Sequence, residues 1–155
     1  MNKKAIIILG IVFLLTVAFI WGNSMLSPEL SDKISRLAGD FLAKFVGVGD
    51  EVSTVGGLSV RKMGHFCEFF ALGIVAWLLL EFSGLHIAAK SVIAALTGIA
   101  VPLLDETIQI FSGRGPMIKD VWIDIGGFAA GVFSSIMMLW AVSRIVEKSK
   151  NEHKN

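Results

Sequence analysis

The chain has 155 residues, of which 54% are hydrophobic and 17% are charged, and its formal net charge is +1. A soluble domain is about 45–50% apolar and about 25% charged, so this composition indicates a membrane protein. The small net charge argues against a nucleic-acid-binding protein, which normally carries a basic patch or stripe. The single cysteine excludes a disulfide within the chain.

Four apolar runs are long enough to cross the hydrocarbon core of a bilayer, which takes about 20 helical residues. They cover residues 5–21, 65–82, 87–104 and 121–142. The sequence therefore predicts an all-α, polytopic membrane protein with four transmembrane helices. No repeat or low-complexity linker divides residues 1–155, so we expect a single domain.

Two of these runs need a further interpretation. The first follows two lysines and could be a signal peptide, but its 17 residues exceed the usual apolar region of such a peptide. We expect it to be retained as a helix. The third run contains Lys90, which lies close enough to the helix end for its charge to reach the membrane interface.

Between the first two runs, Ser27-Pro28 is typical of a helix start, and apolar residues then recur at helical spacing. These residues are Leu30, Ile34, Leu37, Phe41, Leu42 and Phe45. The pattern predicts an amphipathic helix that ends near Gly47 and lies either on the outer leaflet or against the other helices. Residues 56–57, both glycine, predict a flexible approach to the second span.

Basic residues predict the orientation, although their count alone does not decide it, since seven would lie on each side. The flank after the fourth run concentrates Arg144, Lys148 and Lys150 in a short segment, where the positive-inside bias is strongest. We therefore expect a multi-pass protein of the cell membrane with both termini in the cytoplasm.

Three polar blocks fall where the predicted spans meet the outer surface. The first contains Arg61, Lys62, His65 and Glu68, and its spacing puts Arg61, His65 and Glu68 on one helical face. Charged groups at this depth are costly unless they are paired or face a polar cavity. They are therefore candidates for a functional site.

The other two blocks flank the connection between the third and fourth spans. They contain Asp105, Glu106 and Gln109, then Arg114, Lys119, Asp120 and Asp124. Because the predicted spans alternate in direction, all three blocks should arrive at the same end of the bundle. Gly127 and Gly131 form a GxxxG face for close helix packing, which Gly126 and Ala130 extend.

These blocks carry a resemblance to a known family. Their order resembles the signature of the VanZ-like family: Arg61-Lys62-x-x-His65-Phe66-x-Glu68, Asp105-Glu106-x-x-Gln109 and Lys119-Asp120-Val121-x-Ile123-Asp124. The likeness covers roughly residues 21–139 and departs at Asp124, where the family more often has asparagine. It implies a polytopic membrane protein related to one that lowers susceptibility to the glycopeptide teicoplanin, and it implies no known reaction.

The first functional hypothesis is a protein that binds or shields an amphiphile at the extracytoplasmic face. Its partners would be membrane lipids and a lipid-linked wall precursor, an anionic envelope polymer or a lipoglycopeptide. Four basic residues suit phosphate or carboxylate groups: Arg61, Lys62, Arg114 and Lys119.

An alternative is an intramembrane enzyme that modifies an envelope lipid, with His65, Glu68, Asp105 and Asp120 as acid–base groups. A metal would draw on these residues and Glu106, but no HExxH motif, second nearby histidine or nucleophile elbow is present. We therefore expect no metal and no cofactor. The remaining alternative is a membrane scaffold in which these charges only tie helices together.

Overall fold

The computed structural model describes residues 3–46, 54–55, 58–113 and 117–152. The helices of this part are α1 (Lys3–Ser24), α2 (Pro28–Val46), α3 (Val60–Phe82), α4 (Ile87–Phe111) and α5 (Ile118–Glu152). Before α3, β1 (Thr54–Val55) pairs antiparallel with β2 (Leu58–Ser59). The fold is all-α apart from this short pair, which the sequence analysis did not anticipate. The two glycines between the strands lie outside the described residues.

Four of the helices, α1, α3, α4 and α5, are long and apolar enough to cross a membrane, which confirms the four predicted spans. Each helix is longer than its apolar run. Helix α4 continues beyond residue 104 to Phe111, and α5 continues beyond residue 142 to Glu152. Hydropathy identifies only the part of a helix that is apolar enough for lipid. The backbone hydrogen bonds of the helix continue into the polar sequence beyond that part.

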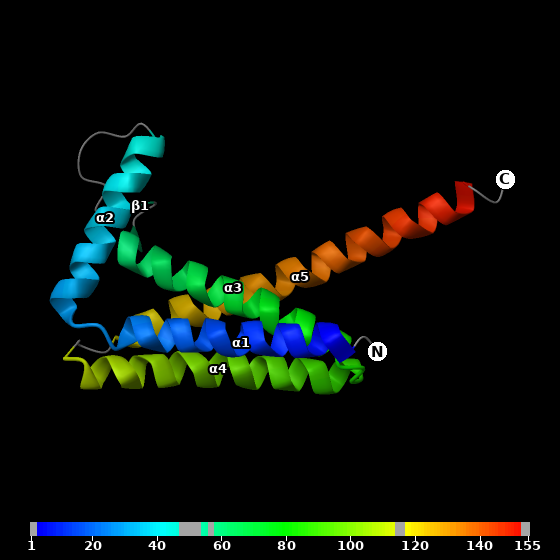
Figure 1. Ribbon diagram of the computed structural model, residues 1–155, viewed down its shortest axis with the longest axis horizontal. Helices are drawn as coiled ribbons and strands as arrows, with labels where there is room; N and C mark the ends of the chain where they lie inside the picture. Colours follow the sequence, from blue (N-terminus) through cyan, green and yellow to red (C-terminus); the bar gives the residue numbers. More distant parts are fainter. Residues whose placement is uncertain (1–2, 47–53, 56–57, 114–116, 153–155) are drawn as a thin grey trace.

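The four long helices alternate in direction (Figure 1). The last turns of α1 and α4 therefore lie at the same end of the bundle as the first turns of α3 and α5. Helix α2 crosses over this end and packs on α3. The C-terminal part of α5 extends beyond the opposite end of the other helices. This arrangement brings the three polar blocks to one place.

The core lies where α1, α3, α4 and α5 face one another. Its buried apolar residues are Val17, Ile20, Phe69, Leu72, Ala76, Val101 and Phe128. Large apolar side chains elsewhere on the long helices are exposed, for example Leu14 on α1 and Leu96 on α4. In water this surface would be unfavourable, whereas a bilayer solvates it, so the exposed apolar surface agrees with four membrane spans.

Helices α3 and α5 approach closely because glycines line their contact. A Cβ atom added at Gly127 would meet the carbonyl oxygen of Phe66, and one at Gly131 would meet that of Phe70. Both glycines of the predicted GxxxG face thus pack against α3. Gly126 does not extend this face, since an added Cβ would meet nothing within 4 Å. It lies beside the contact, about 100° around the helix from Gly127.

Two charged or polar residues near the α3–α4 turn have structural partners. The Lys90 Nζ atom lies 2.7 Å from Glu81 Oε2, so the charge of this buried lysine is paired near the end of α3. His86 is the N-cap of α4, where its side chain accepts a hydrogen bond from the Ala89 N–H.

Local signals in the sequence account for the start of α2 and the end of α4. Ser27 Oγ accepts a hydrogen bond from the Leu30 N–H, 3.4 Å away, and α2 begins at Pro28. Helix α4 ends at Phe111, before Gly113, whose φ of 79° lies in the left-handed region that favours glycine.

Candidate functional site

The first turn of α3 is linked to both neighbouring polar blocks. Arg61 Nη2 donates a hydrogen bond to Gln109 Oε1 on α4, 3.3 Å away. Lys62 Nζ lies 2.8 Å from Asp120 Oδ1 on α5. The three blocks that lie far apart in the sequence therefore meet in space.

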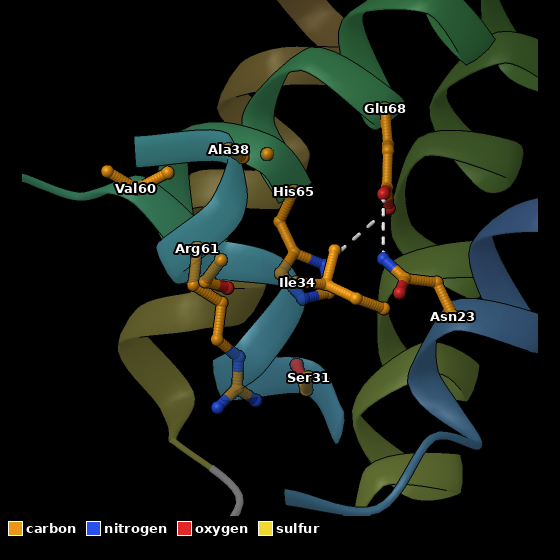
Figure 2. Close-up of a pocket in the computed structure, with 10 residues that line it drawn as sticks. Asn23, Ser31, Ile34, Ala38, Val60, Arg61, His65 and Glu68 are labelled. Atoms are coloured by element: carbon orange, nitrogen blue, oxygen red, sulfur yellow. Dashed lines mark hydrogen bonds and ion pairs between the residues drawn. The ribbon is translucent and has the colours of Figure 1, made fainter. Parts of the chain in front are cut away.

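One turn further along α3, His65 and Glu68 point toward the interior of the bundle. The Nδ1 atom of His65 lies 3.8 Å from Asp105 Oδ2 and 4.0 Å from Glu68 Oε2. Glu68 Oε1 accepts a hydrogen bond of 2.8 Å from Asn23 Nδ2 on α1 (Figure 2). His65 thus stands between two carboxylates, one from its own helix and one from α4.

Helix α4 buries all three of its predicted site residues, Asp105, Glu106 and Gln109. The Gln109 side chain makes the most connections. Its Nε2 donates to Asp105 Oδ2 at 2.9 Å and to Ser24 Oγ at 3.4 Å, while its Oε1 accepts from Arg61. One amide therefore joins α1, α3 and α4 and fixes the orientation of the Asp105 carboxylate.

Helix α5 presents its three described site residues to different environments. Lys119 is exposed, Asp120 pairs with Lys62, and Asp124 is 1% exposed. Asp120 and Asp124 lie one turn apart on the same face of α5. Asp120 is nearer the end of the bundle, and Asp124 lies deeper inside it. Arg114, also a predicted site residue, lies outside the described residues.

Helix α1 supplies two polar residues that the sequence analysis did not include. Asn23 holds Glu68, and Ser24 receives a hydrogen bond from Gln109 and, at its carbonyl oxygen, one of 2.8 Å from Ser112 Oγ. Adjacent Asn and Ser immediately after the first apolar run were the available signal. Their helical position directs them toward α3 and α4.

A cavity of about 110 Å³ lies between α1, α2 and α3, next to this cluster (Figure 2). Its lining residues are Asn23, Ser31, Ile34, Ser35, Ala38, Val60, Arg61, Gly64, His65 and Glu68. Small-molecule pockets are usually about 300–1,000 Å³, so this cavity suits a few water molecules or a compact head group. Its wall combines a guanidinium, an imidazole and a carboxylate with hydroxyl and amide groups.

The charged groups allow two kinds of chemistry. Arg61 presents donors that suit an anionic group. His65 and Glu68, which also line the cavity, are residue types that transfer protons. Their position beside the cavity, one to two turns farther along α3, separates them from the partly buried pair formed by Lys62 and Asp120.

Comparison with known proteins identifies the family of the chain. No curated protein and no solved structure matches the chain. The model of the VanZ/LLP1 family matches residues 5–141, which include α2, α3 and α4 and most of α1 and α5. Together with the four apolar spans and the convergence of the three polar blocks, this match shows that the chain is a multi-pass membrane protein of the VanZ/LLP1 family.

Proposed function

We propose that the protein binds the head group of an amphiphilic or lipid-linked cell-envelope molecule at the extracytoplasmic face of the membrane, and thereby shields it. The observation that carries this proposal is the cavity between α1, α2 and α3, which has Arg61 in its wall. A guanidinium next to a polar cavity is suited to a phosphate or a carboxylate, because it can donate two parallel hydrogen bonds.

Helix α2 supports an amphiphilic rather than a fully soluble ligand. Its apolar residues Leu30, Ile34, Leu37 and Phe41 are exposed, although Ile34 also lines the cavity. An acyl or polyprenyl chain could lie against such residues while its head group occupies the cavity. We infer that α2 lies at the membrane interface, where its apolar side chains contact lipid.

The extracytoplasmic placement rests on charge. Arg144, Lys148 and Lys150 are on the part of α5 farthest from the cavity, and a short basic flank favours the cytoplasm. The cavity end of the bundle would then face outward. A protein that holds a wall precursor there would shield the target of a glycopeptide antibiotic. One that holds a lipoglycopeptide would lower the free concentration of the antibiotic itself. In either case we propose reduced susceptibility to glycopeptides such as teicoplanin.

The direct test is capture of anionic lipid. The full chain is purified in mild detergent, and lipids that remain bound are measured by native mass spectrometry in the presence of phosphatidylglycerol. Arg61→Gln should reduce capture by about 10–100-fold, since a hydrogen bond to a charged group contributes about 1.5–3 kcal/mol.

The matched control is Arg144→Gln. It removes the same charge at the far end of α5, where the guanidinium lies 5.5 Å from the centre of the Trp140 ring. Its capture of lipid should equal that of the unmodified protein. An equal loss of lipid capture in both variants would mean that lipid binding depends only on the net charge of the protein. This result would contradict a head-group site beside Arg61.

A second candidate is an enzyme that modifies an envelope lipid. The observation that favours it is the position of His65 between Glu68 and Asp105, within 4.0 Å of both, because such a group can exchange a proton with a bound substrate. In the capture experiment an enzyme would yield a lipid of changed mass, whereas a binding protein returns it unchanged. A scaffold, the third alternative, would retain no lipid above the Arg61→Gln level.

A further inference from the structure

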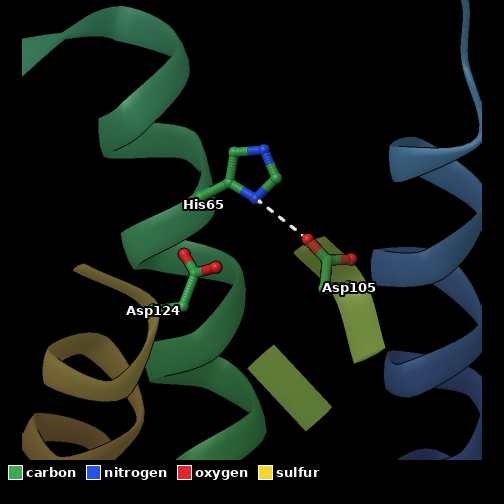
Figure 3. Close-up of side chains that lie close together, drawn as sticks. All are labelled: His65, Asp105 and Asp124. Atoms are coloured by element: carbon green, nitrogen blue, oxygen red, sulfur yellow. Dashed lines mark ion pairs between the residues drawn. The ribbon is translucent and has the colours of Figure 1, made fainter. Parts of the chain in front are cut away.

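A second cluster lies deeper in the bundle, on the side of His65 that faces α4 and α5. His65, Asp105 and Asp124 come from three different helices, and Figure 3 shows their side chains pointing into the same space. One potential ligand atom from each residue lies within 4.8 Å of the other two. All three residues are buried, Asp105 completely.

The two aspartates lack the partners that buried carboxylates require. Neither carboxylate oxygen of Asp124, nor Oδ1 of Asp105, has a hydrogen-bond partner among the described residues. Within the same part of the chain, neither aspartate forms an ion pair with a lysine or an arginine. Asp105 lies next to His65 and accepts one hydrogen bond from Gln109. Two neighbouring carboxylates with so few partners are still strongly unfavourable inside a membrane bundle, so a positive charge or a proton should lie between them.

We propose that His65, Asp105 and Asp124 hold a divalent transition-metal cation of the Zn²⁺ or Mn²⁺ class. One imidazole nitrogen with two carboxylate oxygens is a mixed ligand set that suits these ions better than Ca²⁺ or Mg²⁺, which prefer oxygen ligands alone. The cation neutralises both carboxylates at once. It also accounts for their convergence from three helices.

The spacing is close to that of a metal site. Ligand atoms about 2.1 Å from a tetrahedral ion lie about 3.4 Å from one another. The three atoms, which lie within 4.8 Å of one another, can reach this spacing by small rotations of the side chains. Coordination would therefore require no rearrangement of the helices.

The surroundings also fit a metal site. Gln109 donates a hydrogen bond of 2.9 Å to Asp105 Oδ2, which holds the carboxylate in place as outer partners of metal ligands do. His65 also lines the cavity below α2, so one of the three ligands borders this cavity. This cation site does not depend on head-group binding, because Asp105 and Asp124 do not line the cavity.

Metal content of the full chain tests the proposal. Protein in detergent is stripped with a chelator, incubated with Zn²⁺ or Mn²⁺, separated from free ions by gel filtration and measured by inductively coupled plasma mass spectrometry. We expect about one ion per chain. Asp124→Asn preserves shape but removes the charge, and should weaken binding by more than about 100-fold, beyond the about 10–100-fold typical of outer partners.

The matched control is Asp120→Asn, the same substitution one turn earlier on α5, which should retain one ion per chain. His65→Gln provides a second ligand variant in case Asp124→Asn does not fold, as judged by gel filtration and circular dichroism. Three results would overturn the proposal. The unmodified protein could retain no ion, or a folded Asp124→Asn variant could bind the ion as the unmodified protein does. The protein could also retain Mg²⁺ or Ca²⁺ in preference to Zn²⁺ and Mn²⁺. Lipid capture that persists without metal would leave the head-group site intact.

Discussion

Asp120 and Asp124 differ in environment although only one helical turn separates them. Asp120 meets Lys62 at the end of the bundle, whereas Asp124 is enclosed between α3, α4 and α5. The sequence identified both as site residues one helical turn apart, but it could not show that Asp124 is enclosed, because that depends on how far α5 slides along α3. Asp124 was consequently left out of the possible metal ligands, and the sequence analysis favoured no metal.

Glu68 is the residue at which binding and scaffold functions can be separated. It lines the cavity and accepts a hydrogen bond from Asn23. A glutamine has the same shape and keeps an oxygen that can accept this bond, so Glu68→Gln removes a charge with little change in packing. If the charge acts on a ligand, the substitution affects function more than stability.

We predict that Glu68→Gln abolishes any protection against teicoplanin while the protein remains at normal abundance. The minimum inhibitory concentration should fall to that of cells that carry an empty vector, with abundance measured by immunoblot. Glu29→Gln, the same change on the exposed first turn of α2, is the control and should keep full protection. A loss of protein or of thermal stability in detergent with Glu68→Gln would instead indicate that the carboxylate is structural.

The apolar runs predicted the number of spans, the Ser27-Pro28 signal predicted where α2 begins, and Gly47 predicted where it ends. The close contact of α3 with α5 was predictable in part. The GxxxG pattern identified Gly127 and Gly131, but the pattern does not name the partner helix. It also could not show that Gly126 faces away from the contact, since that requires the rotation of α5 about its own axis.

Because Gly131 lies in the contact and Gly126 does not, the same substitution should change stability in opposite directions at the two positions. Gly131→Ala should destabilise the protein by about 1–3 kcal/mol, because the added methyl group would meet the backbone carbonyl of Phe70, which cannot move aside as a side chain would. Gly126→Ala should be neutral or stabilising by up to about 1 kcal/mol, because alanine favours helix and the position is open. Thermal unfolding in detergent measures both.

A melting temperature that falls equally in the two variants would contradict the packing of α5 on α3. The same measurement bears on the site, because this contact sets the register of α5. Gly131→Ala should therefore also lower metal retention, through the displacement of Asp124 from His65 and Asp105. Gly126→Ala should leave retention unchanged.

At the scale of the whole molecule, the alternating helices divide the protein into two ends of different character. Helix α2 crosses over one end of the bundle (Figure 1). The residues that line the cavity and the buried carboxylates belong to the helix turns at this end. The opposite end has the N-terminus, the α3–α4 turn with its Lys90–Glu81 pair, and the basic extension of α5. The convergence follows from chain direction alone, which is why the sequence could anticipate it. The sequence could not anticipate the cavity, whose walls depend on how α2 folds back over α3.

The positive-inside bias predicts which end faces the cytoplasm. Two residues near opposite ends of α5 can report this: Asn151 is exposed in its last turn, and Met117 is exposed just before its first turn. In a Cys67→Ala background, which removes the only native thiol, Met117→Cys should react with an impermeant maleimide in intact cells. Asn151→Cys should react only after the membrane is permeabilised.

Labelling of both variants after permeabilisation is the control that each thiol is accessible. The reverse result in intact cells, with Asn151→Cys labelled and Met117→Cys protected, would place the cavity in the cytoplasm. A ligand would then have to come from the inner leaflet, where a secreted glycopeptide and the exposed wall precursor are absent. Head-group binding would still be compatible with that outcome, but protection against teicoplanin by shielding at the outer face would not. The labelling experiment therefore tests the shielding separately from the head-group binding.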